Sequence, residues 1–268
     1  MSNLIDFFSE QLEGASPALS TAYAIVCILI VIMAVVCLVL EINVWRKYSK
    51  ANKTGIRSQM SGLDACRYVL DQSGHKDIKV IKAGFLREAV FGNYYNIATK
   101  TIYLRSVLGK IDNKKTVTST AMGVQKAAVA RLCEEGDVQA RTRNKLSLLG
   151  IFGPILFLPV VLIGFLLDVY LLNSTGILSL VSIALGGLLL LAGFLVTMLN
   201  IPVEKRANSL ALKMIEEYGL ADGSEMSMMK EVFDAYILSY IANFILEVLR
   251  VIQWILEIVA KTKNSSKK

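Results

Sequence analysis

Residues Thr120–Cys133 read TAMGVQKAAVARLC, and the rest of the chain is arranged around this stretch. The surrounding segment, Thr116–Glu135, is rich in alanine and has no proline, and after Gly123 it has no glycine. This composition predicts a helix. The helix lies near the C-terminal end of a basic, polar segment, and two long apolar runs follow it in the chain. The order indicates a soluble part joined to membrane-spanning helices.

The overall composition is that of a membrane protein. The 268 residues are 54% hydrophobic, with a mean hydropathy of +0.52, which is too apolar for an ordinary soluble domain. The formal net charge is +7. In a membrane protein, a basic balance indicates charge on the cytoplasmic side or contact with anionic lipid. No nucleic-acid-binding motif is present, so we expect the lipid bilayer and no nucleic acid as a partner.

Three uncharged runs are each long enough to cross a bilayer, which takes about 20 helical residues. They predict transmembrane helices at residues 14–45, where the uncharged run itself ends at Leu40, and at 146–167 and 176–200. Residues 1–13 carry three acidic residues and no Lys or Arg, so the first run lacks the basic start of a cleaved signal peptide. We therefore expect a retained first helix with a short extracytoplasmic N-terminus.

Residues 46–145 form the basic segment, with 20 Lys and Arg against 8 Asp and Glu. This excess places the segment in the cytoplasm. A helical pattern at Gly62–Ser73, short β-branched runs at Ile78–Ile81 and Thr101–Leu104, and a loop at Gly92–Thr99 between them predict a small α+β domain.

The C-terminal part comprises a cytoplasmic helical segment at 201–234, an apolar helix at 235–260 and a basic tail at 261–268. The apolar helix carries polar residues at spacings of three or four, which place them on one face. These candidate membrane or partner contacts are Ser239, Asn243, Glu247, Arg250, Gln253 and Glu257. Two interpretations remain open. The helix is either a fourth span whose stripe packs against protein or an amphipathic helix in the cytoplasmic interface, and the basic tail favours the second.

Four stretches resemble the bacterial membrane-embedded neutral zinc metallopeptidases. Ser61–Gly74 is similar to the family's opening helix, and Asn93–Leu104 (NYYNIATKTIYL) to its DHYDPRTKTLRL-type segment. Gly123-Val124 resembles the start of the active-site helix, and Pro202-Val203-Glu204 the family's PVEFDAS-type segment. The resemblance implies a mainly α-helical membrane protein. It would have an N-terminal transmembrane helix, a small cytoplasmic α+β zincin-like domain, a transmembrane hairpin and a C-terminal amphipathic or membrane helix.

The resemblance also implies a zinc site, but the matching positions do not carry it. Aligned on Gly123-Val124, the HExxH positions fall on Ala127, Ala128 and Arg131, and only Glu204 remains of the presumed ligands. The chain has a single histidine, His75, whereas an HExxH site needs two imidazoles at i and i+4 and a carboxylate base. We therefore expect no catalytic residue and no metal cofactor. A structural ion pair between Arg131 and Glu204 is one hypothesis for what replaces the metal.

These observations predict a catalytically inactive homologue of a membrane zinc peptidase. It would act as a structural or regulatory subunit of a complex in a bacterial plasma membrane. The expected partners are other membrane subunits, such as an active homologue or a membrane scaffold. The Gly-rich third span (Gly186, Gly187 and Gly193) is a further candidate contact surface. The alternative is a metalloprotease with a rearranged, non-HExxH metal site near Glu204, built from Cys66, Cys133 and His75.

Overall fold

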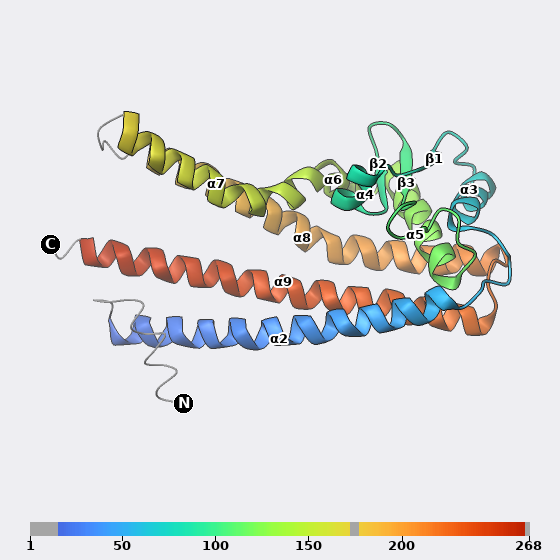
Figure 1. Cartoon of the computed structure of the whole chain (residues 1–268), viewed down its shortest axis with the longest axis horizontal. Helices are drawn as coiled ribbons and strands as arrows, with labels where there is room; N and C mark the ends of the chain where they lie inside the picture. The colour runs from blue at the N-terminus through green and yellow to red at the C-terminus, as the bar shows by residue number, and fades with distance from the viewer. Residues whose placement is uncertain (1–15, 172–176, 266–268) are drawn as a thin grey trace. The chain divides into compact units, whose positions relative to one another are not determined.

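A computed structural model describes residues 16–171 and 177–265 of the chain. The chain divides into two compact units, one of residues 1–44 and 238–268 and one of residues 45–237. The described elements are α2 (Pro17–Lys53), α3 (Gly62–Gln72), β1 (Lys79–Lys82), α4 (Phe85–Phe91), β2 (Tyr94–Asn96), β3 (Thr101–Leu104), α5 (Val117–Glu134), α6 (Val138–Lys145), α7 (Ser147–Leu171), α8 (Ile177–Glu217) and α9 (Gly223–Ser265) (Figure 1).

The protein is mainly helical and has helices suited to a membrane, as expected. Among the described residues, α2, α8 and α9 are each long and apolar enough to cross a bilayer. A fourth candidate is α7, whose two parts, Ser147–Gly153 and Ile155–Tyr170, meet at an angle of 57°. The sequence has a proline between these two parts, and proline within a helix removes one backbone hydrogen-bond donor.

The small sheet has the strand order β1-β3-β2. Strand β3 pairs in parallel with β1 and antiparallel with β2, so Ile102 lies beside both Val80 and Tyr95. The strands expected at Ile78–Ile81 and Thr101–Leu104 are therefore present, the first shifted by one residue. The expected loop at Gly92–Thr99 contains β2, because the Tyr95 side chain is buried and its backbone completes the ladder with β3.

Helix α5 is the centre of the larger unit. It packs against α3, the sheet, α6 and α8, and most of its residues are buried. Thr116 caps its start by accepting a hydrogen bond from the backbone N–H of Ser119. A Cβ atom added to Gly123 would lie 2.2 Å from the carbonyl oxygen of Gly62, so two glycines allow α3 and α5 to cross closely.

Helix α4, which the sequence did not predict, holds the loop that follows β3. Glu88 is fully buried and accepts backbone hydrogen bonds from Ser106, Val107, Leu108 and Gly109, at 2.8–3.0 Å. Burial alone would raise the pKa of the Glu88 carboxyl, but the four donors outweigh it and lower that pKa below its ordinary value of 4.5.

Helix α8 runs without interruption from the apolar run into the polar segment that begins at residue 201. Pro202 removes one helical hydrogen bond. The helix continues because Val203, Glu204 and Ala207 are buried against the domain. A single helix therefore belongs to both the hairpin of α7 and α8 and the domain, and Glu204 lies in the part of this helix that packs in the domain.

The smaller unit is an antiparallel pair formed by the first part of α2 and the last part of α9. Cys37 packs with Ala242 and Leu246, and the side chain of Gln253 contacts Tyr23, so early residues of α2 meet late residues of α9. Figure 1 shows the two helices side by side along this length.

Candidate functional site

The positions expected to correspond to HExxH hold two alanines of the hydrophobic core and one partly exposed arginine. Ala127 and Ala128 are fully buried and pack in the hydrophobic core of the larger unit. Arg131 lies one turn further along α5, where its Nε atom is 2.6 Å from a carboxylate oxygen of Glu135. Arg131 also lines a cavity with Lys213 and Tyr218.

Glu204 is buried and binds groups other than Arg131. Its Oε1 atom lies 2.6 Å from a guanidinium nitrogen of Arg143 and 3.8 Å from the ammonium of Lys126, and its Oε2 atom accepts from the amide of Gln125. The expected Arg131–Glu204 pair is thus replaced by two separate arrangements. The physical reason is the position of each side chain along α8: Gln125 and Lys126 lie beside Glu204, whereas Arg131 lies beside Leu210, Lys213 and Glu217, further along that helix.

Arg143 links α6 to α8 through two acceptors. Besides its bond to Glu204, its Nε atom donates to Oδ1 of Asn200 at 2.7 Å. Sixty-one residues separate Arg143 from Glu204 in the chain. Sequence analysis missed Gln125, Lys126 and Arg143. A local signal existed only for the first two, which directly precede Ala127 in the predicted active-site helix.

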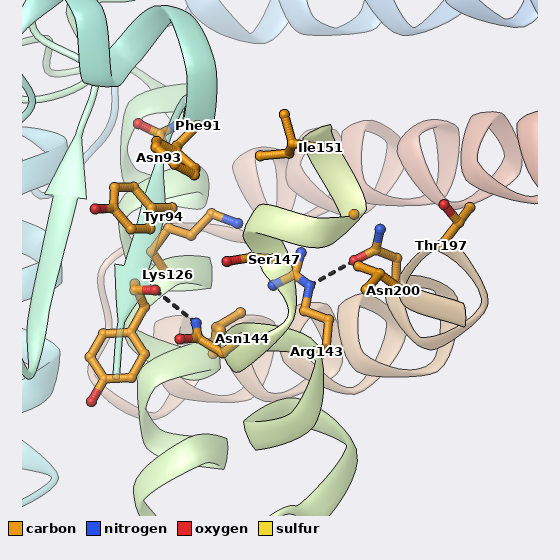
Figure 2. Close-up of a pocket in the computed structure, with 14 residues that line it drawn as sticks. Phe91, Asn93, Tyr94, Lys126, Arg143, Asn144, Ser147, Ile151, Thr197 and Asn200 are labelled. Atoms are coloured by element: carbon orange, nitrogen blue, oxygen red, sulfur yellow. Dashed lines mark hydrogen bonds between the residues drawn. The ribbon is translucent and has the colours of Figure 1, made fainter. Parts of the chain in front are cut away.

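A cavity of about 180 Å³ lies beside these cations (Figure 2). Its wall is formed by α4, β2, α5, α6, α7 and α8. The lining residues are Phe91, Asn93, Tyr94, Tyr95, Lys126, Val129, Arg143, Asn144, Ser147, Gly150, Ile151, Val196, Thr197 and Asn200.

Burial lowers the pKa of Lys126 below its ordinary value. The Glu204 carboxylate raises this pKa, and the charges of Arg143 and Arg105 lower it further.

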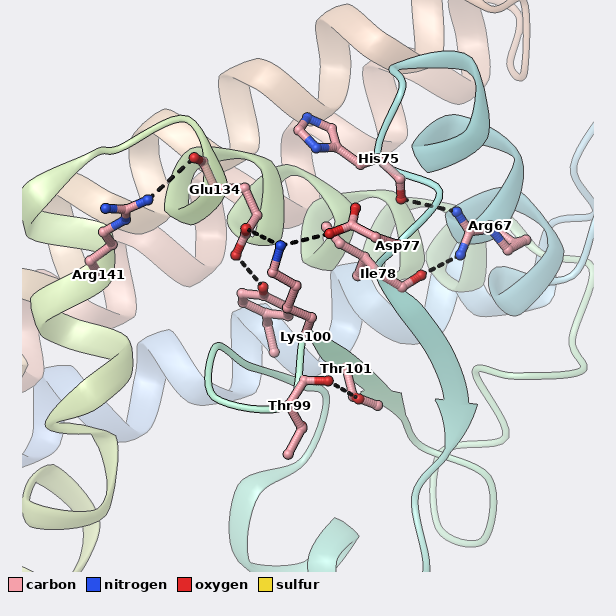
Figure 3. Close-up of polar contacts among 10 residues, drawn as sticks. Arg67, His75, Asp77, Ile78, Thr99, Lys100, Thr101, Glu134 and Arg141 are labelled. Carbon is pink, nitrogen blue, oxygen red and sulfur yellow. Dashed lines mark hydrogen bonds and ion pairs between the residues drawn. The ribbon is translucent and has the colours of Figure 1, made fainter.

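A second polar cluster ties the sheet to the end of α5 (Figure 3). The Lys100 ammonium lies 2.6 Å from Asp77 and 3.0 Å from Glu134, and the Tyr95 hydroxyl donates to Glu134 at 2.7 Å. Burial would raise the pKa of Glu134, but the hydrogen bonds from Tyr95 and Lys100 outweigh it and lower that pKa. Tyr95 and Lys100 belong to the NYYNIATKTIYL segment, which here has a role in holding the domain together.

The described residues do not fit a catalytic zinc. The Ala127 and Ala128 methyl groups offer no ligand or base, and the one retained carboxylate, Glu204, is already in contact with two protein cations. In the part of the chain that the structure describes, no three His, Cys, Asp or Glu residues gather as a metal site would require. Burial also raises the pKa of the Cys66 and Cys133 thiols to about 12, whereas zinc binds the thiolate.

Part of the polar stripe on α9 faces α2. Ser239 donates to Glu41 at 2.8 Å, Asn243 donates to Ser239 at 3.4 Å, and Gln253 donates to the Tyr23 hydroxyl at 3.3 Å. Glu247 is half-buried and has an interaction of its own, whereas Arg250 is exposed. The side chain of Glu257 lies outside the described part of the structure. Contact of the stripe with a partner protein stays a prediction.

The glycines of the third span pack inside the hairpin. A Cβ atom added to Gly186 would meet the ring of Phe157 on α7 at 2.9 Å, and Gly193 approaches Gly153 across the same interface. These two glycines therefore allow α7 and α8 to pack closely, which is the role that small residues have in membrane helices.

Comparison with known proteins supports the resemblance over most of the chain. The family described as "Putative neutral zinc metallopeptidase" matches residues 26–259. The chain belongs to this family. The match to the neutral zinc metallopeptidase family spans α5, α8 and nearly all of α9. Searches of the curated proteins and of the solved structures gave no match.

Proposed function

We propose that this chain is a catalytically inactive member of the neutral zinc metallopeptidase family. The observation that carries the proposal is the environment of Glu204, whose carboxylate binds Arg143, Lys126 and Gln125. A zinc ion at this carboxylate would have to displace two cations or be repelled by them. The alanines at 127 and 128 add to this argument, because no imidazole or general base is available at either position.

Without peptidase chemistry, the remaining role is binding. We propose that the protein is a structural or regulatory subunit of a complex in a bacterial plasma membrane, with residues 46–145 on the cytoplasmic side. The Lys and Arg excess of that segment supports this orientation. Arg250, the exposed cation of the polar stripe on α9, is a candidate for a contact with another membrane subunit, since a charge facing lipid is costly.

Metal content tests the loss of the zinc site. We expect elemental mass spectrometry of the full-length protein, purified in detergent and dialysed, to find far less than one zinc per chain. Glu204→Gln is the matched control, and its zinc content should equal that of the wild type. One zinc per chain that survives dialysis and disappears in Glu204→Gln would contradict the proposal and support a peptidase with a rearranged site.

A further inference from the structure

The cavity beside Glu204 offers hydrogen-bond donors, and the asparagine oxygens in its wall are already in use. Asn93, Asn144 and Asn200 each accept a hydrogen bond through Oδ1, from the Arg105 backbone, the Ile97 backbone and Arg143, respectively. The amide nitrogens of Asn93 and Asn200 therefore remain as donors. Figure 2 shows the Lys126 and Arg143 side chains directed into the same space.

The charge of this space is positive. Lys126 and Arg143 both line the cavity and share one carboxylate, Glu204, which contacts them but is not part of the lining. The Lys126 ammonium has three N–H donors, and its contact with Glu204 is long, at 3.8 Å. One cation is thus left without a matching anion in a place where its side chain is only 12% exposed.

A neighbouring cavity extends this surface. It has a volume of about 460 Å³ and shares Phe91, Tyr94, Tyr95, Asn144 and Ser147 with the first. It adds two more cations, Arg87 and Lys145, both exposed. Among the described residues that line the two cavities, none is Asp or Glu.

The cavities lie where the polar domain meets the apolar hairpin. Ser147 is the first residue of α7, and Asn200 lies one turn before Glu204, the first charged residue of α8. The exposed apolar side chains of Leu148, Phe152 and Met198 lie within a few residues of this junction. Such a junction lies near the lipid headgroups, and basic pockets at this depth recognise anionic headgroups.

We propose that the two cavities form a binding site for an anionic phosphate group, which Lys126 and Arg143 hold, and that the headgroup of a phospholipid with net negative charge supplies it. The phosphate oxygens would accept hydrogen bonds from the unused donors of Lys126, Arg143 and Asn200. The negative charge of the phosphate would also neutralise the excess positive charge. Arg87 and Lys145 lie toward the outer cavity, where the remainder of the headgroup would extend. The inference concerns the space beside Glu204 and stands apart from the proposed loss of catalysis.

Native mass spectrometry of the full-length protein in detergent tests this site. With equal amounts of palmitoyl-oleoyl phosphatidylglycerol and phosphatidylcholine, we expect the protein to retain phosphatidylglycerol preferentially. Lys126→Met should weaken phosphatidylglycerol binding about tenfold, since it removes a charge-assisted hydrogen bond. Lys205→Gln is the matched control, because Lys205 is exposed on α8 and lines neither cavity, and it should leave binding unchanged.

Two further arms make the result decisive. Arg87→Gln combined with Lys145→Gln alters only exposed side chains, so this double variant tests the site if Lys126→Met fails to fold; we expect a severalfold loss. Inorganic phosphate is added as a competitor. If millimolar phosphate leaves the lipid bound, a headgroup is the ligand, and if it displaces the lipid, the site takes free phosphate as well. Equal retention of both lipids, or equal binding by Lys126→Met and Lys205→Gln, would overturn the proposal.

Discussion

At the scale of single residues, Glu204 shows how the surroundings of a carboxylate decide its chemistry. The same side chain that the family resemblance assigns to a metal is here enclosed by an amide and two cations from α5 and α6. Buried pairs of this kind are costly to break, because removing one partner leaves an uncompensated charge.

We expect Arg143 and Glu204 to be energetically coupled. In a double-mutant cycle with Arg143→Gln and Glu204→Gln, the coupling energy should be about 1–3 kcal/mol, because the two side chains are in direct contact and mostly buried. The measurement is the free energy of unfolding in detergent micelles. The parallel cycle with Arg131→Gln should give less than about 0.5 kcal/mol. A larger coupling for Arg131 than for Arg143 would contradict the observed pairing.

Glu88 should make the stability of the domain depend on pH. Because its pKa in the folded state is lowered below 4.5, its contribution is present above that pH and is lost as the pH falls through the folded-state pKa. Glu88→Gln should lower the unfolding free energy at pH 7 by roughly 2–4 kcal/mol, since donors to a buried anion are left poorly matched.

The pH profile of thermal unfolding, recorded between pH 3 and 7, distinguishes this effect from a simple loss of packing. The Glu88→Gln protein should have a flatter acid limb than the wild type. Glu216→Gln, which changes an exposed carboxylate on α8, is the control and should retain the wild-type slope. An unchanged acid limb in Glu88→Gln would show that another group is responsible.

At the scale of elements, the crossing of α3 and α5 depends on Gly62 and Gly123. In Gly123→Ala, the new methyl group would lie 2.2 Å from the Gly62 carbonyl oxygen, so the helices must separate. We expect the unfolding free energy to fall by roughly 1–3 kcal/mol or more, as overpacking does elsewhere. Gly223→Ala is the control, because no heavy atom lies within 4 Å of the added Cβ atom. Equal thermal stability of both variants would contradict the close crossing.

At the scale of the whole molecule, the antiparallel contacts of α2 and α9 bear on the open question of the last helix. If α2 crosses the membrane, the part of α9 packed along it crosses in the opposite direction. Its length and apolar composition also suit a span. This arrangement favours the fourth-span interpretation over the interfacial one that the basic tail alone had favoured.

We therefore predict that the two ends of the chain lie on the same side of the membrane, opposite to the domain. Single cysteines replacing Ser2, Lys110 and Lys268, in a background without Cys27, Cys37, Cys66 and Cys133, can be labelled with an impermeant maleimide in intact cells. Labelling of positions 2 and 268 but not 110 is expected. A protected position 268 with a labelled position 2 would restore the interfacial interpretation.

The sequence by itself determined the membrane class, the main helices, two of the three strands and the absence of an HExxH motif. These properties follow from composition, from local periodicity and from there being one histidine, and none depends on distant contacts. Only the tertiary structure decided that Arg143 binds Glu204, that part of the α9 stripe faces α2, and that Gly186 and Gly193 pack within the hairpin. Each of these contacts joins residues far apart in the chain, whose side chains meet only after the helices have packed. A local sequence pattern therefore cannot predict them.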